Sequence, residues 1–319
     1  MIAADQDIII SDFGIHGFGD GSDGDVTISS PTTLTRDMYY NNLTVNDTLT
    51  TDGYRIFVKE TISGSGTITW GTPNNGANAT NSTGARGGAQ SGSGPLKNTA
   101  GSDGCDGSIH GSTIDTPNDV GNIYGFDTAS NGVQGGRGGK TTSSGADRVG
   151  SVGGLGGVVT YVSKYAKDFF NLLWCLDLNK TTLALVIRRA MSGGGGGGGG
   201  VETGGQGAGG GGGGASGGTV FICAKTWSGT FTIVCVGGNG GNGANGTYSG
   251  GTQYAGGGAS AGNGGIVIRV FRTDNWSGSC TLTGGTKGVH GTTNETGSTD
   301  GSDGVVGTEI EIDIMNIIY

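Results

Sequence analysis

Two runs of glycine, first eight residues and then six, lie between Ser192 and Ala215, close before the apolar segment TVFICAKTW. Ordering a glycine on folding costs more backbone entropy than ordering any other residue. The tract is therefore either a flexible linker or a structure that only glycine can build.

The composition of the chain favours the ordered alternative. Glycine supplies 75 of the 319 residues, but charged residues make up only 13% and there are four prolines. Disordered chains usually combine low hydrophobicity with high charge, whereas 33% of these residues are apolar. A collagen triple helix is disfavoured because no Gly-X-Y period is sustained. We therefore expect an ordered, glycine-rich structure.

The charge of the chain bears on its partners. The formal net charge is −9, and the only adjacent basic pair is Arg188–Arg189, so nucleic acids and anionic membranes are not expected as partners. The start, MIAADQDIIIS, has acidic residues where a secretory signal has basic ones, and we predict no export signal. Asp177, Asn179 and Lys180 interrupt the longest apolar region, which disfavours membrane insertion.

One unit occurs three times in the sequence. It begins at Gly53 (GYRIFVKETISGSGTITW), Gly217 (GGTVFICAKTWSGTFTIVCV) and Gly264 (GGIVIRVFRTDNWSGSCTLT). Each unit has a β-branched strand, a Ser-Gly turn, a second short strand and then a tract rich in glycine, asparagine and threonine. The two strands form either a hairpin or the two faces of a solenoid rung. Such units must stack to become stable.

These patterns predict an all-β, glycine-rich fold with β-solenoid-like or sandwich-like strands. Extended polyglycine can adopt a threefold helix like polyproline II, and several such helices can exchange backbone hydrogen bonds because no side chains separate them. We therefore expect layers of polyglycine-II-type helices, with a flexible glycine linker as the alternative. The alternating segment GTEIEIDIMNIIY predicts a C-terminal strand that could pair with Ile8–Ile10.

Four regions are expected along the chain. Residues 1–75 form an N-terminal β region, 76–157 a Gly/Ser/Asn-rich region, 158–191 a helical insertion, and 192–319 a glycine-rich repeat region with the C-terminal strand. The helix is predicted from a stripe at helical spacing: Tyr165, Phe169, Leu172, Leu173 and Leu176. This helix packs on its own domain or forms a contact with another subunit or virion protein.

Parts of the sequence resemble a viral family. The segments GDGSDGDVTISSPTTLTRDMYYNNLTV, GYRIFVKETISGSGTI and GASGGTVFICAKTWSGTFTIVCVGGNGGNGANG resemble glycine-rich tail-fibre and receptor-binding proteins of tailed viruses of bacteria and archaea. The resemblance covers roughly residues 19–70 and 192–265 by motif. It implies polyglycine-II helices as a scaffold and variable loops that contact the host surface. Homotrimers are common among such fibres, so a homo-oligomer, with a trimer favoured, is expected.

Catalytic motifs are not convincing in this chain. GVQGGRGGKTTS imitates a phosphate-binding loop without the strand that should precede it, and Ser216 and Ser260 lie in GxSxG matches that 75 glycines produce by chance. We therefore expect no enzyme activity. A glycan-degrading tailspike is the less favoured reading, because the spacing of paired carboxylates cannot be read from the sequence.

A metal site is a weaker alternative to simple turns. The three histidines, His16, His110 and His290, occupy similar tripeptides, and a GSDG tetrapeptide lies near each one. They could bind a transition metal, and Asp20, Asp23 and Asp25 in GDGSDGD could bind calcium. Asp, Ser and Gly are also ordinary turn residues, so no cofactor is the primary expectation.

The cysteines predict no metal or redox motif. There are five, an odd number, and none forms a CxxC pair. We expect buried reduced thiols, with a disulfide between Cys223 and Cys235 as the alternative.

The function predicted from these observations is that of a virion structural protein, a tail fibre or tail-tip adhesin exposed on the virion exterior. It would bind a host-cell receptor, a glycan or a surface protein, and would contact other virion proteins. Tyr124, Tyr248 and Tyr254 are the candidate receptor contacts, since aromatic faces suit sugar rings. The alternative is a capsid-decorating spike or baseplate component that binds no receptor.

Overall fold

The computed structural model describes residues 17–107, 192–193, 195, 199, 207–246, 254–292 and 297–314. In this part of the chain the regular secondary structure is almost all strand, with essentially no helix, so the described part is all-β, as the sequence predicts. The predicted helical insertion, residues 158–191, lies outside the described residues.

The described strands form two sheets, and all of their strand pairs are parallel. The larger sheet has seven strands, ordered β1 (Gly24–Ile28), β3 (Met38–Val45), β5 (Ile56–Gly64), β7 (Thr219–Trp227), β9 (Ile266–Phe271) and β12 (Thr308–Asp313), with β10 (Thr273–Asp274) beside β7. The smaller sheet has five: β11 (Ser279–Thr281), β8 (Thr232–Val234), β6 (Thr67–Thr69), β4 (Thr48–Thr50) and β2 (Thr32–Thr33).

The chain passes from one sheet to the other at each turn, so the two strands of each sequence unit do not pair as a hairpin. The C-terminal strand β12 pairs with β9. The N-terminal segment that was predicted to pair with it, Ile8–Ile10, lies outside the described residues.

Glycine makes the sharp turns between the sheets possible. Gly64 and Gly229 have φ values of 116° and 84°, a region that side-chain-bearing residues seldom adopt. The turns also stack on one another, because Phe231 N–H donates to the Gly64 carbonyl at 3.1 Å and Ser277 N–H donates to the Gly229 carbonyl at 3.0 Å. Each Ser-Gly turn therefore positions the next one along the stack.

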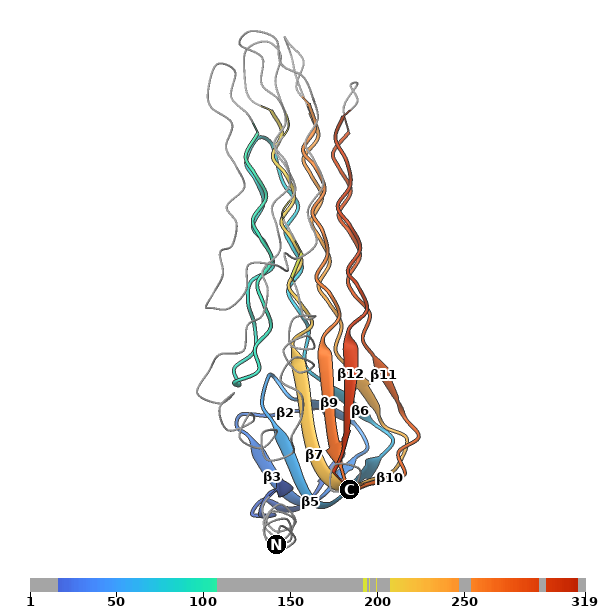
Figure 1. The fold of residues 1–319 in the computed structure, drawn as a ribbon. Helices are drawn as coiled ribbons and strands as arrows, with labels where there is room; N and C mark the ends of the chain where they lie inside the picture. Colours follow the sequence, from blue (N-terminus) through green and yellow to red (C-terminus); the bar gives the residue numbers. More distant parts are fainter. Residues whose placement is uncertain are drawn as a thin grey trace, which may run out of the picture.

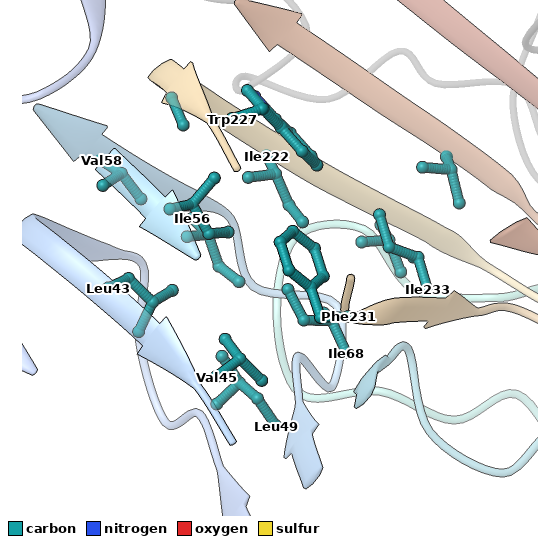
Figure 2. Close-up of a cluster of buried hydrophobic side chains, with 14 of the residues drawn as sticks. Leu43, Val45, Leu49, Ile56, Val58, Ile68, Ile222, Trp227, Phe231 and Ile233 are labelled. Atoms are coloured by element: carbon teal, nitrogen blue, oxygen red, sulfur yellow. The ribbon is translucent and has the colours of Figure 1, made fainter. Parts of the chain in front are cut away.

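A continuous apolar core fills the space between the two sheets, and Figure 2 shows its side chains converging from both. Alternate residues of each strand point inward, as strand geometry requires. In the smaller sheet the register aligns Leu49, Ile68, Ile233 and Cys280 into one inward column. Tightly buried aromatic side chains, Trp227 and Phe231, complete this core.

A second apolar cluster covers the opposite face of the larger sheet. It is built from outward-facing residues of the sheet together with Phe18 from the segment before β1: Phe221, Cys223, Ile266, Ile268, Val270, Ile312 and Ile314. Both faces of the larger sheet are therefore buried, which explains why β7 and β9 are apolar along most of their length instead of alternating.

Charged residues of β9, β10 and β12 lie at one end of the inner core. The inward column runs from Ile222 to Arg269 and then to Glu311. Arg269 is only 2% exposed, forms ion pairs with Asp274 (3.1 Å), Glu309 (2.6 Å) and Glu311, and lies over the ring of Trp276 at 4.4 Å. In the described residues the smaller sheet ends at β11, so no strand of that sheet lies across the core from β12. The charged layer covers the end of the apolar core at this place.

The long glycine-rich connections all lie on the same side of the strand stack, where strands of the smaller sheet end and strands of the larger sheet begin. They join a strand of the smaller sheet to the next strand of the larger sheet and span residues 70–218, 235–265 and 282–307. Figure 1 shows their described parts running side by side away from the sheets. We call these packed segments the glycine lattice: residues 74–107, 192–199 where described, 207–218, 235–246, 254–265, 282–292 and 297–307.

Hydrogen bonds in the glycine lattice repeat every third residue. In the central segment each of the nine residues from 209 to 217 donates its backbone N–H to a carbonyl of another segment. Residues 209, 212 and 215 donate to the segment 74–81, residues 210, 213 and 216 to 99–105, and residues 211, 214 and 217 to 257–263. Carbonyls of the same segment accept N–H groups from Ala85 and Gly88, from Gly193, and from three residues of the segment 238–244. The central segment is thus bonded to neighbours on all sides.

Close approach of these backbones requires glycine. A Cβ atom placed on Gly212 would lie well within contact distance of the Arg86 carbonyl oxygen, and one on Gly214 would meet the Gly238 carbonyl in the same way. Most of the non-glycine residues enclosed in the lattice are small, as the buried cluster Ala79, Ala85, Ala208 and Ala244 illustrates.

We expect Gly212→Ala to destabilise the protein by about 1–3 kcal/mol, because an added methyl group overpacks a rigid backbone lattice. The measurement is the denaturant midpoint and slope of unfolding. Ala77→Ser is the matched control, since Ala77 is exposed and its carbonyl accepts the N–H of Gly212 at 3.0 Å. Equal stability of the two variants would contradict the close packing.

Candidate functional site

The predicted receptor-binding tyrosines are only partly within the described residues. Tyr124 and Tyr248 lie outside them. Tyr254 is 7% exposed, and its carbonyl accepts the N–H of Ala208 at 3.2 Å within the glycine lattice. Tyr254 therefore presents little surface to a ligand. The predicted receptor contacts that remain are Tyr124 and Tyr248.

The three aspartates of GDGSDGD are each held by a different set of partners. Asp20 Oδ1 accepts the N–H of Ser22 at 2.9 Å, and this bond lowers the pKa of Asp20. Asp23 pairs with Arg36 at 2.5 Å and accepts the N–H of Tyr39 at 2.7 Å. The hydrogen bond from Arg36 is the main reason that the pKa of Asp23 is lowered.

Asp25 is used by neighbouring amides. Its Oδ1 accepts hydrogen bonds from Asn41 Nδ2 at 2.7 Å and Asn42 Nδ2 at 2.8 Å, and both bonds lower its pKa. These contacts fasten the start of β1 to β3. They are the contacts of a turn and a strand pairing.

His290 lies in a small charged group on the lattice. Its Nδ1 is 2.6 Å from Asp300 Oδ1, and Lys287 Nζ is 3.1 Å from Asp300 Oδ2. The backbone N–H of His290 also donates to Asp300 Oδ1, at 3.0 Å, and these contacts lower the pKa of Asp300 to about 2. A lysine ammonium beside the carboxylate already supplies the positive charge that a metal ion would bring.

The other candidate metal ligands, His16 and His110, lie outside the described residues. Among the residues that the structure does describe, no group of three or more His, Cys, Asp or Glu side chains is arranged to hold a metal ion. The histidines and aspartates that the sequence singled out are therefore not brought together in this part of the chain.

The four described cysteines are free thiols. Cys223 belongs to the outer apolar cluster and Cys235 to the inner core, so the sheet separates them and the alternative disulfide is excluded. Burial raises the pKa of both thiols. They act as small apolar side chains, as expected.

The most regular polar feature is a set of asparagines at three-residue spacing on one face of the glycine lattice. We call it the asparagine face: Asn75, Asn78, Asn239, Asn242 and Asn245, all exposed. Asn75 Oδ1 accepts the N–H of Asn239, and Asn78 Oδ1 accepts that of Asn242, both at 2.8 Å. Asn239, Asn242 and Asn245 accept the N–H groups of Thr286, Val289 and Thr292 in turn, at 2.8–2.9 Å.

These side chains replace a missing neighbour. At the surface of the lattice an N–H group has no further backbone segment to bond, and the carboxamide oxygen takes that place. The sequence analysis missed this face, although the repeat GGNGGNGANG, with an asparagine at every third residue, was the signal that could have identified it.

Aspartates cap other columns of the same lattice. Asp103 Oδ1 accepts the N–H of Gly87, and Asp106 Oδ1 accepts that of Gly84, each at 2.7 Å. Asp303 Oδ1 accepts the N–H of Lys287 at 2.9 Å. A carboxylate is therefore as capable of this contact as a carboxamide.

Comparison of the chain with protein-family models, curated proteins and solved structures finds no match. Within the described residues no helix is long and apolar enough to cross a membrane.

The ion pairs of Asp300 predict a pH-dependent contribution to stability. Since its folded-state pKa is about 2, below the ordinary value of 3.8 for an aspartate, Asp300 stabilises the fold above about pH 4 and loses that effect as the pH falls towards 2. Asp300→Asn keeps the acceptor for His290 N–H but removes the charge. Its melting temperature should be lower than that of the wild type at pH 7, and the difference should vanish near pH 2. A difference that does not change with pH would contradict the assignment.

Proposed function

We propose that the chain is a β-solenoid with polyglycine-II-type helices extending from one side of it. We further propose that it serves as a virion tail fibre or tail-tip adhesin that binds a receptor on the host-cell surface. In this proposal the protein is a structural component on the virion exterior, contacts other virion proteins, assembles as a homotrimer and has no enzyme activity.

The parallel stacking supports the solenoid reading. The chain contributes one strand to each sheet per turn, and successive Ser-Gly turns are hydrogen-bonded to each other. The three-residue period of hydrogen bonding supports the polyglycine-II reading, because polyproline-II-like helices have three residues per turn.

The observation that carries the functional proposal is the projection of the glycine lattice away from the sheets (Figure 1). The lattice is held by backbone hydrogen bonds instead of a large apolar core, so it extends as a thin, ordered structure and leaves its surface side chains available for contacts. A rigid projection of this kind suits a protein that must reach a surface at a distance from the particle that carries it.

The test is to add the purified protein to candidate host cells, measure surface binding and block virus adsorption with it. Binding that competes with adsorption and releases no sugar is expected. Tyr124→Ala and Tyr248→Ala are expected to weaken binding, with Thr33→Ala as the control because Thr33 is exposed on β2 within the smaller sheet.

Failure to bind cells that the virus infects would contradict the adhesin proposal and favour a spike or baseplate component. Release of soluble sugar would contradict the non-enzymatic part of it and favour a glycan-degrading tailspike.

A further inference from the structure

We infer that the asparagine face of the glycine lattice is a binding surface for an extended, neutral polysaccharide. This inference rests on the proposed attachment function and specifies its ligand class and site. It assigns recognition to the asparagine face, at residues that differ from the tyrosines considered above.

The carboxamides of the asparagine face have a fixed orientation. Each of the five Oδ1 atoms accepts a backbone N–H at 2.8–2.9 Å, and only an oxygen can accept such a bond, so the amide nitrogens must lie on the other side. Within the described residues no hydrogen bond to a protein group is made by these Nδ2 atoms. Each exposed asparagine therefore presents an NH₂ donor to solvent with its rotamer already set.

These NH₂ donors are regularly spaced along the lattice. With a polyproline-II-like rise of about 3.1 Å per residue, asparagines three residues apart are separated by roughly 9 Å along a segment. Asn239, Asn242 and Asn245 lie on one segment, and Asn75 and Asn78 lie on the neighbouring one, as their side-chain contacts show. A periodic donor array fits a ligand whose acceptors also repeat, and hydroxyl oxygens repeat along a polysaccharide chain.

Asparagine is one of two residue types that cap the lattice in this way. Aspartate makes the same cap to the backbone at positions 103, 106, 300 and 303, so capping alone does not require asparagine. What distinguishes asparagine from aspartate is the neutral NH₂ donor. The face is thus uncharged and rich in donors, which favours hydroxyl acceptors of a neutral glycan, and the net charge of −9 disfavours a polyanion.

The asparagine face is already formed on a hydrogen-bonded backbone, so its side chains would lose little conformational entropy on binding a ligand. The exposed residues beside the asparagines, Thr286 and Thr292, carry hydroxyl groups that can bond a sugar as donors or acceptors.

The experiment uses the full-length protein and a panel of purified neutral polysaccharides: cellulose, chitin, mannan, dextran and β-1,3-glucan. The test variant is Asn239→Asp with Asn242→Asp, which keeps both backbone caps and removes both donors. Binding to the polysaccharide that retains the wild type is expected to weaken about tenfold or more, as loss of two hydrogen bonds implies.

Two control variants accompany it. Asp103→Asn with Asp106→Asn makes the reverse exchange on another column, and Thr32→Asp with Thr33→Asp adds the same charge on the exposed strand β2. Both should bind as the wild type does. Hydrogen exchange at Thr286 and Val289 should be as slow in the test variant as in the wild type, which verifies that the caps persist.

The inference would be overturned if none of these polysaccharides retained the wild type. So would undiminished binding of the test variant. If the wild type still binds host cells in either case, only the ligand and site assigned here are wrong, whereas absence of cell binding would refute the attachment function itself.

Discussion

The structure depends on one constraint, that backbone amides brought together without side chains must bond to each other. In the central segment, residues 209–217, three successive N–H groups point to three different neighbours, and this pattern repeats along the segment. Segments as distant in sequence as 74–81 and 257–263 meet there for this reason. A side chain at Gly212 or Gly214 would hold these backbones apart.

The two parallel sheets determine which glycine segments lie beside each other, which the lattice alone does not determine. A glycine segment carries almost no side-chain information about its neighbours. Several segments directly precede or follow a strand, such as 207–218 before β7 and 235–246 after β8, and an apolar core fixes the register of these strands, as in the column of Leu49, Ile68 and Ile233. The order of the strands in the sheets therefore sets the order of the glycine segments, which continue side by side away from the sheets (Figure 1).

Much of the β stack could be predicted from the sequence, because strand alternation and the Ser-Gly turns at Gly64 and Gly229 are local signals. The pairing of glycine segments could not, because glycine offers no pattern that distinguishes one neighbour from another. The candidate site was predicted less well. The GDGSDGD motif was expected to form ordinary turns, with a calcium site as the weaker alternative, and in the structure Asp23 is bonded by Arg36 and Asp25 by Asn41. The asparagine repeat was visible, but its role depends on which segment lies beside it.

The most direct test of the lattice is hydrogen exchange, followed by mass spectrometry, in peptides covering residues 207–217. If all nine amides from 209 to 217 are bonded to neighbouring segments, their exchange should be as slow as that of the buried strand β7. A flexible glycine linker would exchange completely at the earliest time point. Slow exchange would support an ordered backbone lattice, and immediate exchange would contradict it.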